Sequence, residues 1–214
     1  MSSRRPLLLG HRGAKKYAAE NTPAAFDLAL THGCDGFEFD VRYTRDSRGV
    51  VCHDALHRRR SIRARSFEEL NLPHAEEVIH EYAPRAYLDV ELKVPGDPSP
   101  ILAALRSASR NRYIISSFLP EVLEAVHERG ADTPLGLICE NVRQLRLWSS
   151  LPIRALIVQQ KLVTQTLVNE VHADGKQVFV WTVNTERQMR RFAELGVEGL
   201  ISDDTQLLVR TLKK

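Results

Sequence analysis

The sequence predicts an α/β fold: a closed (β/α)8 barrel of the TIM type, in a single domain spanning residues 1–214. The chain alternates strand-like and helix-like segments eight times. The strand-like segments are apolar, as in a parallel sheet that is buried on both faces. The length also suits one barrel of this kind. An open, doubly wound parallel sheet is the alternative architecture for such an alternation.

Eight short segments rich in β-branched or aromatic residues are typical of buried parallel strands. A ninth, at residues 50–53, follows the second strand after only six residues. Because that gap is too short for a parallel crossover, the two segments should form an antiparallel hairpin, which leaves eight strands for the barrel. These eight cover residues 7–9, 36–43, 87–92, 113–118, 135–138, 155–158, 178–183 and 199–202.

Four helices have clear start and stop signals. Thr22 can cap a helix whose first position is Pro23 and whose end is Gly33. Three more carry apolar residues at helical spacing and also end at a glycine: they run from residue 120 to 130, from 164 to 175 and from 185 to 196. Less sharply marked helices are expected over residues 75–82, 100–109, 142–149 and from 205 to the end.

The composition is that of an ordinary soluble protein, with 43% hydrophobic and 27% charged residues. The net charge of +3 fits an anionic small substrate but is too small to indicate a nucleic-acid partner. Cys34, Cys52 and Cys139 are scattered and should be buried, reduced thiols. The apolar run at residues 7–9 is too short for a signal peptide, and no segment is long enough to span a bilayer. The protein is therefore expected in the cytoplasm.

Polar side chains lie on or directly after the first two predicted strands, towards the ends where barrels of this type carry their active sites. His11 and Arg12 follow the first strand. Glu38 and Asp40 lie two apart on the second strand, so both should face the same way. The hairpin then returns His53 to the neighbourhood of Asp40.

The later strands repeat this arrangement. Glu91 and Lys93 lie two apart and should share a face of the third strand. Ser117 ends the fourth strand, Trp181 lies late in the seventh, and Asp203 follows the eighth. A closed barrel would bring all of these positions to one mouth.

This set of residue types suits a divalent metal beside a phosphate ester. Three carboxylates cannot be buried together unless a cation neutralises them. Oxygen ligands alone favour Mg²⁺ or Ca²⁺, with Mn²⁺ as a further candidate, over zinc. Two histidines can act as acid and base on opposite sides of the phosphorus. Arg12 and Lys93 can hold the non-bridging oxygens.

Each feature alone has a purely structural explanation, such as a surface Glu-x-Asp pair or a Glu91–Lys93 ion pair. Their joint occurrence at three consecutive strand ends favours a functional site. Trp181 belongs either to the core or to a wall against the alkyl part of a substrate. The remaining histidines are expected to be solvated: His32, His57, His74, His80, His127 and His172.

The run of Arg58, Arg59 and Arg60, followed by Arg63 and Arg65, is either a solvated loop or a surface that attracts an anionic substrate. The sequence contains no phosphate-binding loop, dinucleotide fingerprint or nucleophile elbow.

At these residues the sequence resembles the glycerophosphodiester phosphodiesterase family. The matching segments are HRG, ENTPAAFDLALTHGCDGFEFDVRYT, VVCHD, ELK, VFVWTVN and GVEGLISDD, in this order. The resemblance implies a barrel that hydrolyses glycerophosphodiesters to glycerol 3-phosphate and an alcohol with a divalent metal. It implies His11 and His53 as the acid/base pair. It also implies Glu38, Asp40 and Glu91 as metal ligands, Arg12 and Lys93 as phosphate contacts, and Trp181, Asn21 and Phe118 as pocket residues.

The resemblance further suggests that a neighbouring hydroxyl of the substrate attacks first, giving a cyclic phosphate that water opens later. One departure from the family concerns the inserted segment at residues 54–87. Family members usually have a longer segment here, which covers the glycerol end of the site. A more open mouth would accept lysophospholipids, as a lysophospholipase D-like enzyme does. A non-catalytic barrel that only binds phosphate is the remaining alternative, and in each case the partner is a small phosphodiester.

Overall fold

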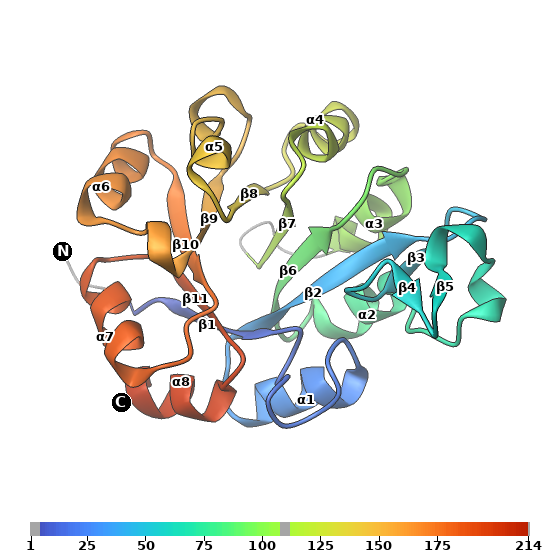
Figure 1. Ribbon diagram of the computed structural model, residues 1–214, viewed down its shortest axis with the longest axis horizontal. Coiled ribbons are helices and arrows are strands. Elements are labelled where there is room, and N and C mark those ends of the chain that lie inside the picture. Colours follow the sequence, from blue (N-terminus) through green and yellow to red (C-terminus); the bar gives the residue numbers. More distant parts are fainter. Residues whose placement is uncertain (1–4, 108–111, 214) are drawn as a thin grey trace.

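A computed structural model describes residues 5–107 and 112–213, and in it eight parallel strands close into a barrel. The first strand, β1, pairs with both β2 and the last strand, β11. The predicted barrel is therefore confirmed, and the open sheet is excluded (Figure 1). The barrel strands are β1 (Leu7–His11), β2 (Gly36–Tyr43), β6 (Tyr87–Leu92), β7 (Tyr113–Ser117), β8 (Leu135–Cys139), β9 (Ala155–Gln159), β10 (Gln177–Trp181) and β11 (Gly199–Ser202).

The helices lie around the outside of the barrel (Figure 1). Thr22, Thr164 and Thr185 cap α1, α6 and α7 with their side chains, as their sequence positions predict. The helices are α1 (Pro23–Thr31), α2 (Ala75–Tyr82), α3 (Ser99–Ala104), α4 (Pro120–Arg129), α5 (Val142–Leu145), α6 (Gln165–Ala173), α7 (Glu186–Glu194) and α8 (Thr205–Leu212).

Two helices are shorter than the sequence predicts. The helix expected over residues 100–109 becomes α3 followed by a 3-10 turn, η3 (Leu105–Ser107). Residues 108 and 109 of that prediction lie outside the described residues. The helix expected over 142–149 becomes α5 followed by a second turn, η4 (Trp148–Ser150).

The predicted hairpin is present. β3 (Gly49–Val51) pairs antiparallel with the end of β2, with Val51 opposite Val41. Beyond it the chain leaves the barrel as a small two-stranded hairpin, β4 (Leu56–His57) and β5 (Arg60–Ser61). Two 3-10 turns, η1 (Ile62–Ala64) and η2 (Phe67–Glu69), then lead back towards α2, and a last one, η5 (Gln160–Leu162), follows β9.

The strands bury both faces, and the two faces differ in composition. Phe37 and Phe39 point outwards into the large core between strands and helices, where both are fully buried. A smaller cluster fills the barrel interior, with Leu9, Tyr87 and Phe179 among its members. Because side chains alternate along a strand, the interior positions two and four residues after Tyr87 belong to acidic residues. The barrel is thus apolar at one end and polar at the other.

Cys34, Cys52 and Cys139 are free thiols, as expected. Cys34 and Cys139 are buried, but Cys52 is only partly buried because it lies after β3, where the chain leaves the barrel. Among the described residues, no helix has the length and apolar character needed to cross a membrane.

Barrel closure requires a close approach at Gly36. A Cβ atom there would lie 1.8 Å from the carbonyl oxygen of Tyr87 on the neighbouring strand. We therefore expect Gly36→Ala to lower the free energy of unfolding by about 3 kcal/mol, the upper part of the range for overpacked positions. Gly196→Ala is the matched control, since no atom of the described residues lies within 4 Å of its added Cβ and only its φ of +82° is unfavourable. That control should lose only about 1 kcal/mol in urea-induced unfolding, and equal losses for the two variants would contradict this account.

Candidate active site

A cavity of about 560 Å³ opens at the carboxyl ends of the barrel strands. Most of the site residues predicted from the sequence line it, although they come from strands far apart in the chain. One side of the cavity is charged and the other is apolar. Its lining residues are His11, Arg12, Glu38, His53, Asp89, Glu91, Lys93, Phe118, Leu119, Ile138, Glu140, Gln144, Ile157, Trp181 and Ile201.

The three predicted carboxylates meet on the charged side. One oxygen each of Glu38, Asp40 and Glu91 lies within 4.8 Å of the others, and all three residues are buried. Asp40 is completely covered and lies behind the cavity wall. The cluster has the number and type of ligands that a hard divalent cation requires.

The charge state of these carboxyls reflects their crowding. Burial, together with the charges of Asp40 and Glu91, raises the pKa of Glu38 well above its usual value. Burial and Asp40 raise the pKa of Glu91 to about 7. Burial also opposes ionisation of Asp40, but Lys93 and Arg12 outweigh it and lower the Asp40 pKa. Among the residues that the structure describes, none forms a hydrogen bond with the buried oxygen Oε1 of Glu38. A buried, acceptor-only cluster that includes such an oxygen fits a bound cation.

Two cationic side chains hold the acidic cluster together. Lys93 Nζ lies 2.7 Å from Glu91 Oε1 and 3.3 Å from Asp40 Oδ1. Arg12 Nε lies 3.2 Å from Asp40 Oδ2, and its guanidinium also bonds Glu20. The backbone N–H of Arg12, at a φ of +53°, donates to Glu38. Both cations line the cavity, where they can also contact an anion.

Asn21 stands behind this cluster rather than in the cavity wall. Its Nδ2 donates to Asp40 Oδ2 over 2.7 Å, and its Oδ1 accepts from the backbone N–H of Asp40. Asn21 is buried and adopts a φ of +59°, in the left-handed region that asparagine tolerates better than most residues. It therefore orients Asp40, and its position gives no contact with the cavity.

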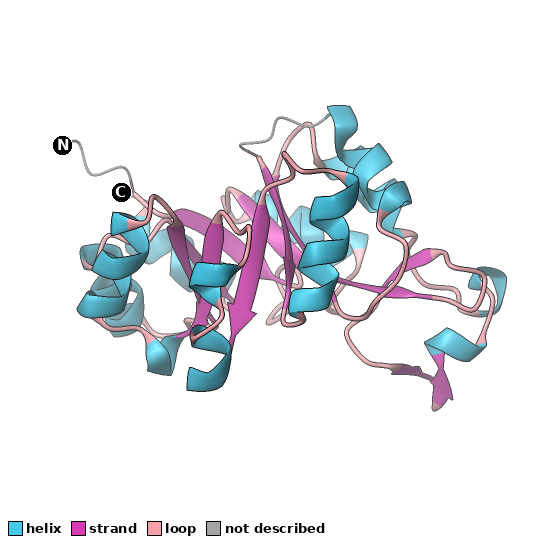
Figure 2. Ribbon diagram, turned by 90° about the horizontal axis from the view of Figure 1, so that it is seen from above, coloured by secondary structure: helices cyan, strands magenta, loops and turns pink. Residues whose placement is uncertain are grey.

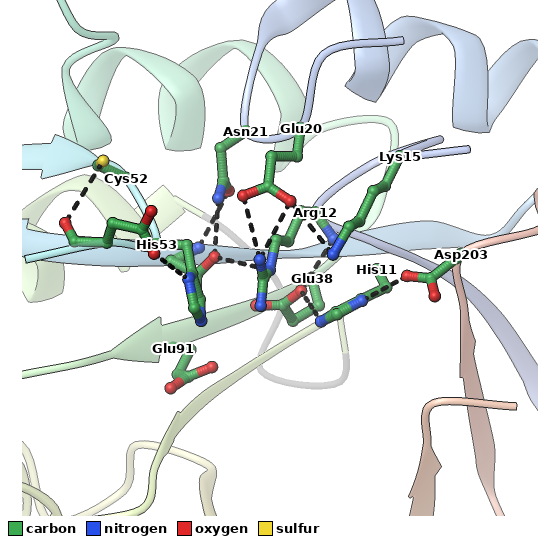
Figure 3. A network of polar contacts seen from close by, with 12 residues as sticks. His11, Arg12, Lys15, Glu20, Asn21, Glu38, Cys52, His53, Glu91 and Asp203 are labelled. Atoms are coloured by element: carbon green, nitrogen blue, oxygen red, sulfur yellow. Dashed lines mark hydrogen bonds and ion pairs between the residues drawn. The ribbon is translucent and has the colours of Figure 1, made fainter. Parts of the chain in front are cut away.

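Both predicted histidines line the cavity, and Figure 3 shows Glu38 between them. Each is held by an aspartate through Nδ1. His11 Nδ1 lies 2.6 Å from Asp203 Oδ1, and His53 Nδ1 lies 2.8 Å from Asp54 Oδ1. With Nδ1–H donating to the carboxylate, Nε2 is the ring atom that can exchange a proton in the cavity, and in His11 it lies 3.9 Å from Glu38 Oε2. Burial lowers the pKa of His11, although the bond to Asp203 opposes this effect.

Asp203 is itself fixed by Asn184, which lies in the loop between β10 and α7. Asn184 Nδ2 donates to Asp203 Oδ2 over 2.6 Å, while Asn184 Oδ1 accepts from the backbone N–H of Asp203. The sequence shows Asp203 at a strand end, but the residue that it orients could not be identified without the structure.

Asp89 is a fourth buried acid that the sequence reasoning did not select. It lines the floor of the cavity and bonds the hydroxyl of Ser116. Burial raises its pKa to about 7. The sequence does indicate this position, since Asp89 precedes Glu91 by two residues and must share its strand face.

The apolar side of the cavity includes Phe118 and Trp181, whose rings meet edge to face at a centroid distance of 5.6 Å. Ile138, Ile157 and Ile201 continue this wall. Trp181 is partly exposed, so it belongs to the wall of the cavity and is more than a core residue.

One prediction about the other histidines was wrong. His74 is buried, not solvated: Arg48 Nε and Glu76 Oε2 both lie close to its Nε2, and the Phe67 ring packs against it. The remaining five are partly or fully exposed: His32, His57, His80, His127 and His172.

The fold and this cavity define a class: a (β/α)8 barrel whose mouth combines an acidic cluster, two imidazoles and two cations. The model of the Glycerophosphoryl diester phosphodiesterase family matches residues 11–78 and 69–207. The chain belongs to this family, and the resemblance seen in the motifs is confirmed.

Individual relatives support this family assignment. A glycerophosphodiester phosphodiesterase of Caldanaerobacter subterraneus is 28% identical over 97% of this chain and 98% of its own length. One from Bacillus altitudinis is 28% identical over 92% and 94% of the two chains.

Solved structures show the same fold. A phosphodiesterase of Oleispira antarctica, in complex with the product sn-glycerol-3-phosphate, superposes with a TM-score of 0.84 at 22% identity and covers 98% of both chains. A glycerophosphodiester phosphodiesterase of Thermotoga maritima gives a TM-score of 0.82 at 24% identity, covering 97% of this chain and 98% of its own.

The acidic cluster predicts a pH-dependent effect of cations on stability. The Glu91 pKa is raised from 4.5 to about 7 on folding, so its contribution to stability is complete below about pH 4.5 and is lost as the pH rises through 7. With a chelator, the melting temperature should therefore fall between about pH 5 and pH 8. Mg²⁺ or Ca²⁺ at about 100 times its dissociation constant should restore about 5–10 °C at the higher pH and much less at the lower, where protons compete.

The double variant Glu38→Gln/Glu91→Gln is the control for this experiment. It removes two of the crowded charges, so its melting temperature in chelator should vary less with pH, and cations should no longer raise it. An equal cation effect at both pH values in the unaltered protein would show that the cluster is not the binding site.

Proposed function

We propose that this protein hydrolyses glycerophosphodiesters to glycerol 3-phosphate and an alcohol, using one divalent cation and two histidines. The main support for the proposal is that His11 and His53 line one cavity beside the three-carboxylate cluster. Family membership and the relatives' names support the substrate class.

Glu38, Asp40 and Glu91 would hold the cation, with Mg²⁺ and Ca²⁺ as the leading candidates and Mn²⁺ as a third. When bound there, such an ion polarises a phosphoryl oxygen and stabilises the negative charge that develops on it. The side chains of Arg12 and Lys93 would bind the other phosphate oxygens, Arg12 through its planar guanidinium and Lys93 as a point charge.

The two imidazoles would move the protons. One Nε2 takes the proton of the attacking hydroxyl, and the other ring protonates the leaving oxygen on the opposite side of the phosphorus. The attacking group would be the substrate's own neighbouring hydroxyl, so that a cyclic phosphate forms first and water opens it afterwards. Asp203 and Asp54 hold Nδ1 of the two rings and so keep Nε2 directed at the substrate.

The apolar wall favours a second candidate substrate. Phe118, Trp181 and three isoleucines offer a surface for an alkyl chain, and the short segment at residues 54–87 is proposed to leave the mouth open. A lysophospholipid would use the same catalytic residues.

Replacing either histidine by alanine should lower kcat by about 10²–10⁴-fold, the usual contribution of a general acid or base, with little change in melting temperature. The assay follows glycerol 3-phosphate released from glycerophosphocholine and glycerophosphoethanolamine, and choline released from lysophosphatidylcholine, with Mg²⁺, Ca²⁺ or chelator. His172→Ala, an exposed histidine on α6, is the matched control and should keep the normal rate.

The panel also separates the alternatives. Turnover confined to lysophosphatidylcholine would favour the second substrate. Tight binding of glycerol 3-phosphate with no turnover of any diester under any cation would make the protein a binding module and would overturn the proposal.

Asp203→Asn tests the proposed orientation of His11. The amide keeps the shape but no longer favours Nδ1–H, so kcat should fall by about 10- to 100-fold, less than for His11→Ala, while KM changes little. Asp203→Glu should recover part of the rate. Asp204→Asn is the control: Asp204 caps α8 and bonds Lys16 and Tyr17, so its loss should lower stability without lowering kcat. Equal effects of Asp203→Asn and Asp204→Asn on kcat would refute the orienting role.

A further inference from the structure

One segment beside the active site has an unusual charge. Residues 55–67, here called the basic arm, contain five arginines and a histidine but no aspartate or glutamate. The whole chain has 30 basic and 27 acidic residues, so the rest of the molecule carries a slight negative excess. The positive charge of the protein is therefore concentrated in this arm.

Four of the five arginines of the basic arm have exposed side chains. Arg58, Arg59, Arg60 and Arg63 are exposed, and within residues 5–107 and 112–213 none of them forms an ion pair with an acidic side chain. Other arginines of the protein, such as Arg12 and Arg85, are paired with carboxylates. The four side chains are thus available to a negatively charged partner.

The tip of the arm has a backbone conformation that disfavours arginine. Arg58 and Arg59 form the two-residue turn between β4 and β5, with φ angles of +49° and +64°. Turns of this type prefer Asn-Gly, because glycine has no Cβ atom and asparagine tolerates the left-handed region better than most other residues. The chain carries two arginines where the turn itself would be more stable with neither, which indicates that their charges have a use.

The arm lies next to the cavity and ends in solvent. It follows directly from His53, which lines the cavity, and Figure 2 shows it projecting beyond the helices on the side towards which the barrel strands point. Leu56, in the first strand of the hairpin, is 57% exposed. Val142, also 57% exposed, lies between the cavity-lining residues Glu140 and Gln144. Leu56 and Val142, here called the apolar rim, are therefore exposed in segments that adjoin the cavity-lining residues.

We infer that the basic arm and this apolar rim bind the surface of an anionic phospholipid membrane. Arginines near such a surface are attracted by its negative potential, while exposed leucine and valine side chains can enter the boundary between headgroups and acyl chains. A nucleic acid would also attract the arginines, but the exposed side chains beside them are aliphatic and not aromatic, so they offer no stacking platform. This inference goes beyond the proposed hydrolysis and does not depend on it.

The test is cosedimentation of the full protein with vesicles of phosphatidylcholine alone and with vesicles that also contain phosphatidylglycerol. The unaltered protein should bind the anionic vesicles more tightly, and added salt should release it. Arg58→Asn/Arg59→Gly should reduce the partition coefficient about 25-fold, since each basic residue near such a surface contributes about fivefold. Because Asn-Gly suits the turn, this variant should keep or raise the melting temperature.

The matched control is Arg112→Gln/Arg129→Gln. It removes the same charge from two exposed arginines at the other end of the barrel, before β7 and at the end of α4, and should leave vesicle binding unchanged. Leu56→Ser should weaken binding to anionic vesicles without changing net charge. Equal binding to neutral and anionic vesicles, an equal loss in both arginine variants, or binding of single-stranded RNA with none to vesicles would overturn the inference. Because binding is read without turnover, a failure here leaves the proposed hydrolysis untouched.

Discussion

The crowding of Glu38, Asp40 and Glu91 is the constraint on which the rest of the site depends. Three acceptor-only groups within 4.8 Å repel one another, and burial increases that repulsion. Two effects reduce this repulsion. Lys93 and Arg12 keep Asp40 ionised, whereas Glu38 and Glu91 have raised pKa values. The arrangement stays balanced only while positive charge remains close to the carboxylates.

The barrel accommodates this crowding because its interior is apolar at one end and acidic at the other. Along β6, Tyr87, Asp89 and Glu91 occupy successive inward positions, so the same strand passes from apolar packing to acidic chemistry within five residues. The outward residues, such as Leu88 and Val90, are fully buried against the helices and hold the strand in place. This apolar packing between strands and helices stabilises the fold and offsets the repulsion among the buried carboxylates.

The fold and the centre of the site could be predicted from the sequence because they follow from short-range periodicity. Alternation by two places Glu38 with Asp40, and glycines and threonines mark the ends of several helices. The orientation of His11 by Asp203 and the burial of His74 depend on packing between distant segments, which no local pattern records. The sequence predicts Asn21 as a pocket residue, but its contacts with Asp40 place it behind that carboxylate and not in the cavity wall.

The bond between His11 and Asp203 joins side chains 192 positions apart, one at the end of the first barrel strand and the other directly after the last. A ribosome delivers one of these strands at the beginning of synthesis and the other close to its end. A nascent chain therefore holds its first imidazole without an orienting partner until the final strand has docked. Prematurely terminated chains would lack that partner altogether, so full competence arrives only when the ring of strands is complete.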